Sequence, residues 1–215
     1  MIKAAIFDMD GLMFDTESLF SEVQHKIAQK RGKKFTNSTK YKMMGQKAID
    51  AIAIMLNDLE IEENPEDVFQ EQNKDYLELI RTKADPMPGL FHLLDLLDAK
   101  GIRKAVATSS LREWVDILFN RFDLYKRFEL VITGDMVSKG KPDPEIYLKA
   151  VNLLKLKPEE CVVIEDGLNG VKSGKAAGCC VAAVPSYFTK DQDFSVADIA
   201  VSSLWDKRLR DFIVE

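Results

Sequence analysis

The chain has 215 residues, of which 46% are hydrophobic, and its formal net charge is −5 at pH 7. This length and apolar content suit one core of moderate size, with or without an inserted lobe. The 30 basic residues are scattered rather than gathered in a stripe, which argues against a nucleic-acid-binding surface. No apolar run approaches the roughly 20 residues that a membrane helix needs, and the N-terminus lacks the pattern of a signal peptide. We therefore expect a cytoplasmic protein with neither nucleic acid nor membrane as a partner.

The N-terminal stretch begins as an apolar run and ends in acidic residues. Residues 2–7 predict a short buried strand, and Asp8, Asp10 and Gly11 follow it directly. Ligands of open α/β folds bind at the carboxyl ends of the strands, so these carboxylates lie where a site is expected. Two carboxylates this close repel each other unless a proton or a cation lies between them, and Mg²⁺ prefers such oxygen ligands. One carboxylate can then attack an electrophile while the other transfers a proton, although this pattern alone also fits an acidic turn.

The segment that follows shows helical periodicity and no convincing strand. Its apolar residues recur at steps of three and four, and Asn64 before Pro65 predicts the start of one of its helices. We predict a helical cap domain over residues 16–85, inserted after the first strand. Residues 1–15 and 86–215 would then form the core domain.

Strand-like and helix-like segments alternate after the predicted cap. Ser110 with Glu113 fits a capping box for a helix over residues 111–120, and Asp143 fits the cap of a helix that begins at Pro144. The alternation predicts an α/β fold with a Rossmann-like, doubly wound parallel sheet and right-handed crossovers. The predicted later strands span residues 104–107, 129–133, 161–164, 179–184 and 199–201.

Polar residues follow several of these strands, as they follow the first. Thr108, Ser109 and Ser110 end the second strand at the start of a helix, where hydroxyls and free amides bind anions, although Ser110 equally fits a simple cap. Lys141 precedes Pro142, which holds it out of helical geometry, so that its ammonium can be directed at one point. Such a lysine can bind a phosphate and balance carboxylates, although most lysines are simply solvated.

The fourth element is the pair Glu165 and Asp166, which ends an apolar strand and would complete an oxygen cage for a metal ion. Each of the four elements has an ordinary structural explanation, but their order, each after a predicted strand, favours one site. Because it carries these four elements in this order, the chain resembles the haloacid dehalogenase superfamily along its whole length. Its helical insertion resembles the small cap of the β-phosphoglucomutase-like branch. The matching motifs are Asp8-Met-Asp10-Gly-Leu, Thr108, Lys141 within Gly-Lys-Pro-Asp-Pro-Glu-Ile-Tyr, and Glu165-Asp166.

The resemblance implies a magnesium-dependent phosphatase. Asp8 would be the nucleophile that forms an aspartyl-phosphate, and Asp10 would protonate the leaving alcohol and then activate water. Family dehalogenases lack the second aspartate, so Asp10 favours phosphoryl transfer. The implied substrate is a small phosphorylated metabolite, such as a sugar phosphate or a nucleoside or pseudouridine monophosphate, and the implied oligomeric state is a monomer. The implied metal ligands are Asp8, Asp10, Glu165 and Asp166, and the implied phosphate ligands are Thr108, Ser109 and Lys141.

Two other activities remain open at this stage. Mutases of the branch carry a histidine and an arginine in the cap where this chain has Phe20 and Ala48, which favours a phosphatase, but Lys47 is close enough to replace the arginine. Gly45, Gln46 and Lys47, in a segment that faintly resembles pseudouridine-5′-phosphatases, are the predicted cap contacts to substrate. A two-component receiver domain, which is a phosphorylated switch rather than an enzyme, gathers similar residues around Mg²⁺. Receivers lack a helical insertion, so this alternative is disfavoured.

Overall fold

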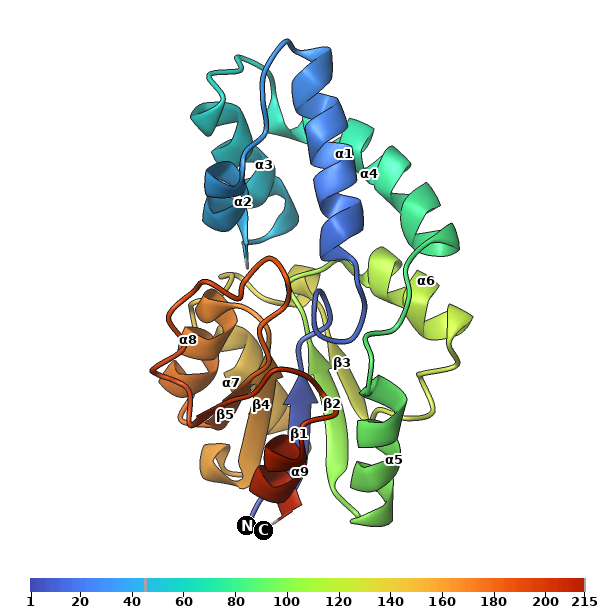
Figure 1. Ribbon diagram of the computed structural model, residues 1–215, viewed down its shortest axis with the longest axis vertical. Coiled ribbons are helices and arrows are strands. Elements are labelled where there is room, and N and C mark those ends of the chain that lie inside the picture. The colour runs from blue at the N-terminus through green and yellow to red at the C-terminus, as the bar shows by residue number, and fades with distance from the viewer. Residues whose placement is uncertain (45, 215) are drawn as a thin grey trace.

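The computed structural model describes residues 1–44 and 46–214. Within them, six parallel strands form one sheet with the order β3-β2-β1-β4-β5-β6 (Figure 1). The chain moves outward from the central β1 through β2 to β3, then crosses back to β4 on the other side of β1. This doubly wound topology confirms the predicted fold class. The strands are β1 (Ala4–Phe7), β2 (Arg103–Ala107), β3 (Leu130–Ile132), β4 (Cys161–Glu165), β5 (Cys180–Ala183) and β6 (Ile199–Ala200).

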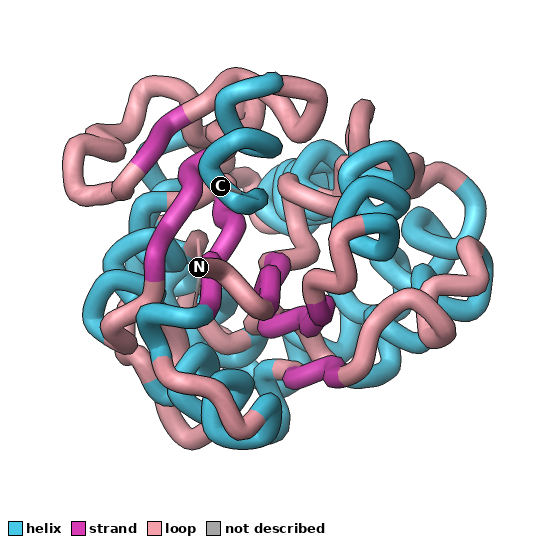
Figure 2. Tube along the Cα trace, turned by 90° about the horizontal axis from the view of Figure 1, so that it is seen from below, coloured by secondary structure: helices cyan, strands magenta, loops and turns pink. Residues whose placement is uncertain are grey.

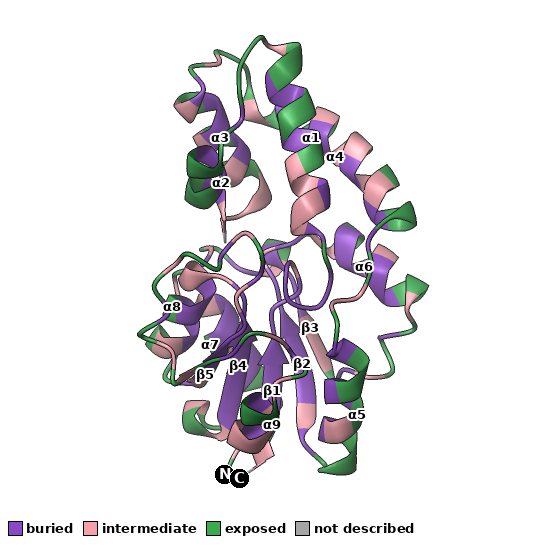
Figure 3. Ribbon diagram, viewed as in Figure 1, coloured by how far each residue is buried: buried purple, intermediate pink, exposed green. Residues whose placement is uncertain are grey.

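Helices cover both faces of this sheet, as the view from below shows (Figure 2). Neighbouring residues of β1 belong to opposite hydrophobic clusters: Phe7 packs with the cluster of α5, α6 and α9, and Ile6 with that of α7 and α8. Both faces of β1 are therefore buried, which explains its continuous apolar sequence (Figure 3). These helices are α5 (Leu90–Ala99), α6 (Arg112–Arg121), α7 (Glu145–Leu154), α8 (Leu168–Ala176) and α9 (Lys207–Val214), with 3-10 turns η1 (Gly134–Met136) and η2 (Pro158–Glu160).

Four helices, here called the cap, lie beyond the carboxyl ends of the strands (Figure 1). Phe20 and Tyr76 of the cap pack with Trp114 of α6, and the centroids of Phe20 and Tyr76 lie 4.1 Å apart. The predicted start of α4 is confirmed, because Asn64 accepts a hydrogen bond from the Glu66 amide and Pro65 is the first helical residue. The cap helices are α1 (Glu17–Lys30), α2 (Asn37–Met43), α3 (Ala48–Asp58) and α4 (Pro65–Thr82).

The two segments that connect the cap to the sheet run side by side. The Asp15 amide donates to the Asp85 carbonyl over 3.0 Å, and the Met87 amide donates to the Met13 carbonyl over 2.8 Å. The boundaries of a separate cap domain at residues 16 and 85 stay a prediction, although these contacts lie beside them. Within residues 1–44 and 46–214, no helix combines the length and the hydrophobicity needed to cross a membrane.

Candidate active site

Three buried carboxylates meet at the carboxyl ends of β1 and β4. These parallel strands are paired with Phe7 opposite Ile164, so Asp8 follows opposite Glu165, and Asp166 comes one residue later. One oxygen from each of Asp8, Glu165 and Asp166 lies within 4.8 Å of the others. Gly11 makes this approach possible, because its φ is +79° and a Cβ there would lie 2.5 Å from Asp166 Oδ2.

The charges of these carboxylates call for a cation. Burial raises the pKa of Asp8 well above its ordinary value, more than the Lys141 ammonium lowers it. Burial, followed by the nearby charges of Glu165 and Asp8, does the same to the pKa of Asp166, whose Oδ2 is buried without a hydrogen-bond partner. Two such carboxyl groups, one with an orphaned oxygen, fit a hard divalent cation of the Mg²⁺ type.

Lys141 lies between two of the acids and bridges them. Its Nζ donates to Asp8 Oδ1 over 2.5 Å, to Glu165 Oε1 over 2.6 Å and to the Ala107 carbonyl over 3.2 Å. Burial lowers the pKa of Lys141, but Asp8 and Glu165 more than offset this, so its pKa lies well above the ordinary value. The ammonium therefore stays charged and directs one oxygen of Asp8.

Glu165 is occupied by donors of the protein itself. Its Oε1 accepts from Lys141 and, over 2.6 Å, from the hydroxyl of Tyr147, and its Oε2 accepts from the Gly167 amide over 3.2 Å. Gly170 leaves room for this carboxylate, since a Cβ there would lie 1.8 Å from Oε1. The arrangement positions Lys141, and it leaves Asp8 and Asp166, which have fewer protein donors, as the carboxylates for a metal ion. Sequence reasoning missed Tyr147, although it ends the motif around Lys141.

Asp10 is held by three hydroxyl groups. Its Oδ1 accepts from Thr16 over 2.8 Å, and its Oδ2 accepts from Thr108 over 3.0 Å and from Ser110 over 2.6 Å. The predicted capping box is therefore wrong: α6 begins at Arg112 without a side-chain cap, and Ser110 serves the site instead. The fully buried Thr108 also contacts Asp10 here, and its Oγ1 accepts from the Ser110 amide.

A cavity of about 420 Å³ lies between these strand ends and the cap. Gln46 lines it, but Lys47 does not, because its Nζ donates to the Val137 carbonyl over 3.0 Å. The predicted contact between Lys47 and substrate stays a prediction, and the third predicted contact, Gly45, lies outside the described residues. We call the strand-end residues the floor, namely Asp8, Asp10, Ser109, Ser110, Lys141, Glu165 and Asp166. We call the cap residues that line the cavity the wall, namely Glu17, Phe20, Gln24, Lys40, Tyr41, Met43, Met44, Gln46, Ala48 and Ala51.

Sequence reasoning did not find most of the wall. Gln24 lies one helical turn after Phe20 on α1, and Lys40 lies on α2. Both are nearly buried, which is unusual for these residue types, but they carry no motif. Their role could be inferred only after the cap was placed over the strand ends. The cap is held there by polar contacts such as that from Asn169 Nδ2 to the Met44 carbonyl, over 2.9 Å.

Comparison with known proteins now defines the class of this enzyme. The family model for haloacid dehalogenase-like hydrolases matches residues 5–184, so the chain belongs to this family, and the predicted resemblance is confirmed.

Several relatives are similar over most of their length. The phosphorylated carbohydrates phosphatase of Thermotoga maritima is 36% identical over 181 residues, which cover 82% of each chain. The (DL)-glycerol-3-phosphatase 2 of Arabidopsis thaliana is 36% identical over 213 residues, or 95% of this chain and 88% of the relative. The crystal structure of CbbY from Rhodobacter sphaeroides with phosphate is 27% identical, covers 95% of both chains and has a TM-score of 0.84. A mutant of CbbY in complex with xylulose-(1,5)bisphosphate has a TM-score of 0.85.

Proposed function

We propose that this protein is a Mg²⁺-dependent phosphatase that hydrolyses a small phosphorylated sugar or polyol through an aspartyl-phosphate on Asp8. The observation that carries the proposal is the meeting of Asp8, Asp10 and Lys141 on the floor of one cavity, from two separate parts of the chain. Membership of a hydrolase family supports the reaction type. The names of the relatives from Thermotoga and Arabidopsis support a phosphorylated carbohydrate or glycerol phosphate as substrate.

We assign separate tasks to the two aspartates. Lys141 binds Asp8 Oδ1, so the other oxygen of Asp8 attacks phosphorus while the bond from phosphorus to the leaving oxygen breaks. Asp10 gives its proton to that leaving oxygen, and then takes a proton from the water that attacks phosphorus in the aspartyl-phosphate. The bond between the Asp8 oxygen and phosphorus breaks in this second step, which releases phosphate and regenerates the Asp8 carboxylate. The hydroxyls of Thr16, Thr108 and Ser110 fix the carboxyl group of Asp10 for both transfers.

Asp8 and Asp166 are the side chains that would hold the metal, with the Asp10 backbone carbonyl implied as a third ligand by the family resemblance. Their close oxygens and the orphaned Oδ2 of Asp166 fit an ion of this kind. When bound, Mg²⁺ offsets the negative charge of the phosphoryl group and of the carboxylates. Ser109 lines the same cavity and is assigned to the phosphoryl oxygens together with Lys141.

A phosphate-release assay with Mg²⁺ tests the proposal. The wild type should release phosphate from sugar phosphates and glycerol 3-phosphate, and excess EDTA should stop the reaction. Asp8→Asn should lower kcat by about a thousandfold or more, because the nucleophile is lost. Asp15→Asn is the matched control, since Asp15 is exposed and should leave kcat within about twofold. Normal turnover by Asp8→Asn would overturn the mechanism.

The cap disfavours the mutase alternative. A mutase must hold the second phosphate of a bisphosphate intermediate, and Lys47 was the residue expected to do so in place of an arginine. Lys47 instead contacts Val137, and Ala48 lines the cavity without a charge. Incubation with β-glucose 1-phosphate should therefore yield free phosphate and no glucose 6-phosphate.

A further inference from the structure

The cap contributes one cation to the cavity, and that cation is already neutralised. Lys40 Nζ lies 2.9 Å from Glu17 Oε2 and donates to the Glu17 carbonyl over 2.9 Å and to Ser21 Oγ over 2.6 Å. An ammonium has three protons, and here each has an acceptor within the cap. The ring of Phe188, whose centroid lies 3.3 Å away, covers the same ammonium. Lys40 is therefore a structural cation, buried with its own carboxylate, and is not placed to bind an anionic ligand.

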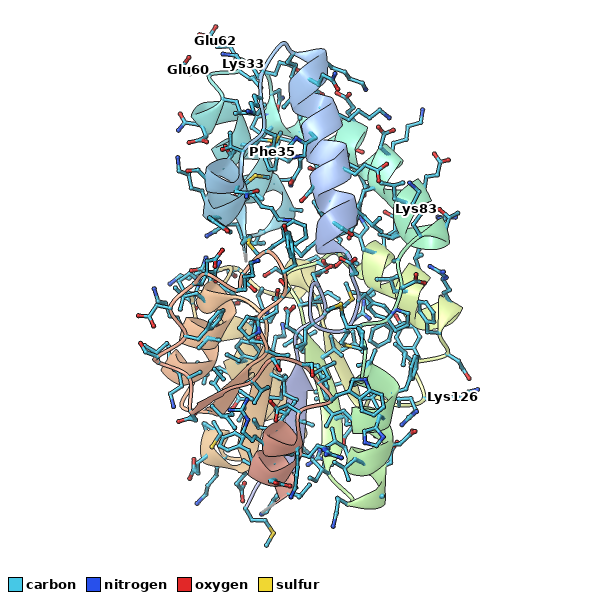
Figure 4. The ribbon with its side chains drawn as sticks, viewed as in Figure 1. Lys33, Phe35, Glu60, Glu62, Lys83 and Lys126 are labelled. Carbon is cyan, nitrogen blue, oxygen red and sulfur yellow. The ribbon has the colours of Figure 1, made fainter. Side chains whose placement is uncertain are left out.

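Among the cavity residues that the structure describes, no other cation is left to bind a second anionic group. Lys40 and Lys141 are the only basic residues among the described residues that line the cavity, and Lys141 is paired with Asp8 and Glu165. Glu17 is paired with Lys40, and Asp191 also lines the cavity and adds negative charge. Lysines such as Lys33 and Lys83 lie at the periphery of the cap, away from the sheet (Figure 4). An extra anion would thus meet carboxylates at low dielectric, without a counter-charge.

The wall and the adjacent Trp114 of α6 offer aromatic surface, and the wall offers one unsatisfied amide. Phe20 lies beside Trp114, with ring centroids 5.3 Å apart, and both line the cavity. Gln24 lines it one turn further along α1, is 4% exposed, and its Oε1 is buried without a hydrogen-bond partner. Buried amides normally have partners, and a hydroxyl group both donates and accepts, so it can satisfy either end of the amide.

Resting on the phosphatase activity proposed above, we infer that the wall selects an uncharged, hydroxyl-bearing leaving group and rejects a leaving group with a second anionic group. The phosphoryl group binds at the floor, the carbon skeleton packs on Phe20 and Trp114, and a hydroxyl pairs with Gln24. Anions are rejected because Glu17 holds the Lys40 ammonium, so that no cation among the described wall residues is free to meet a second anionic group. The fold itself does not require this choice, because the similar CbbY binds a sugar bisphosphate. The selection belongs to the wall residues of this chain.

A pair of substrates with one carbon skeleton tests the rejection of anions. Glycerol 3-phosphate and 3-phosphoglycerate differ chiefly in a hydroxymethyl group that is replaced by a carboxylate. We expect kcat/KM for glycerol 3-phosphate to exceed that for 3-phosphoglycerate by at least about tenfold. Glu17→Gln should reduce this ratio by about fivefold or more, since it leaves the Lys40 ammonium without its carboxylate and free to attract the carboxylate of the substrate. Glu22→Gln is the matched control: Glu22 lies on the same helix, is exposed, does not line the cavity, and should leave the ratio unchanged.

A second pair tests the role of Gln24. Glycerol 3-phosphate and n-propyl phosphate have the same carbon chain, but the second lacks hydroxyl groups. The wild type should prefer glycerol 3-phosphate in kcat/KM, and Gln24→Met should lower this preference by about tenfold, because Met fills similar volume without an amide. A preference that survives in Gln24→Met would overturn the assignment of Gln24.

The outcomes separate the inference from the proposed function. Equal or better turnover of 3-phosphoglycerate, or a ratio unaffected by Glu17→Gln, would overturn the selection of neutral leaving groups and leave the phosphatase intact. If Mg²⁺-loaded wild type releases no phosphate from any of these esters or from p-nitrophenyl phosphate, the proposed function itself is wrong. Preference for glycerol 3-phosphate with a smaller ratio in Glu17→Gln supports both.

Discussion

The floor and the wall of the cavity satisfy their charges in different ways. On the floor, Lys141 lies between Asp8 and Glu165, and Asp166 keeps an oxygen without a hydrogen-bond partner. The charges of the floor are therefore arranged to bind a metal ion and a phosphoryl group. On the wall, Lys40 is saturated by Glu17 and Ser21, so its charge is complete before any ligand arrives. The floor is therefore suited to phosphoryl transfer, and the wall is suited to selecting the shape and polarity of the leaving group. Floor variants should slow every substrate alike, and wall variants should change ratios between substrates.

Loss of Lys141 should have the largest effect. Lys141→Met leaves Asp8 and Glu165 buried without their counter-charge, which should lower the free energy of unfolding by about 3–5 kcal/mol. It should also lower kcat by about a thousandfold for all phosphomonoesters. Chemical denaturation and phosphate release measure the two effects. Lys139→Met, an exposed lysine of the same loop, should change stability by less than about 0.5 kcal/mol. Equal effects of the two substitutions would contradict the assigned role of Lys141.

Removal of Mg²⁺ should be the next largest perturbation. At 100 times its dissociation constant, the ion should stabilise the fold by about 2.7 kcal/mol, and Asp166→Asn should reduce this gain. Without metal, burial raises the pKa of Asp8 and Asp166, so the folded chain binds protons that the unfolded chain releases. The contribution of these groups to stability then falls as pH rises from their ordinary pKa towards the raised value.

Calorimetry gives a direct measurement of this linkage. Mg²⁺ binding should release protons, which appears as a binding enthalpy that depends on the ionisation enthalpy of the buffer. The same titration of Asp166→Asn should show a smaller proton release. Binding without any buffer dependence would mean that the carboxyl groups are already ionised in the metal-free protein.

Substitution of Tyr147 tests how much the position of Lys141 depends on the hydrogen bond that Tyr147 donates to Glu165. Tyr147→Phe removes a donor to Glu165 and should lower the free energy of unfolding by about 1–3 kcal/mol. Because Glu165 directs Lys141, kcat should fall by about tenfold while KM changes little. Tyr125→Phe is the control, since the Tyr125 hydroxyl contacts the exposed Asp116. Combining Tyr147→Phe with Glu165→Gln should give less than the sum of the single effects.

Ser110 should show the smallest effect on stability. If Ser110 capped α6, Ser110→Ala would cost about 1 kcal/mol, but its hydroxyl contacts Asp10 instead. Asp10 is only half-buried, lines the cavity and keeps Thr16 and Thr108 as donors, so we expect a loss of less than about 0.5 kcal/mol. The kcat should fall several-fold, because Asp10 loses one of its three hydroxyl donors. Thermal unfolding beside steady-state kinetics separates the two roles. A clear loss of stability with normal kcat would restore the capping interpretation.

The sequence predicted well those features that depend on local pattern. Apolar runs located the strands, and Asn64 before Pro65 located the start of α4. Strand ends were less accurate: residues 129–133 were expected where β3 spans Leu130–Ile132, because strand limits depend on pairing with a neighbour. The α7 start shifted by one residue, although Asp143 does accept from the Glu145 amide.

Features of the site that depend on distant partners were predicted less well. Ser110 matched a local capping pattern, but its partner Asp10 lies 100 residues away in sequence. Sequence spacing placed Lys47 close to Gly45, but it cannot show that the Lys47 ammonium donates to the Val137 carbonyl. Gln24 and Lys40 carry no motif, and their place at the cavity follows only from how the cap sits over the strand ends.

The paired connecting segments have a consequence for how such enzymes diversify. Asp15 and Asp85 are joined by a backbone hydrogen bond, so the chain leaves and re-enters the sheet at almost the same place. An insertion whose ends already touch adds little strain to its host, whatever its own length. We therefore expect that helical insertions from other family members can be exchanged between Asp15 and Asp85, and that the strands of the sheet would keep their register. The inserted helices would then determine the substrate range, and the residues at the strand ends would determine the reaction.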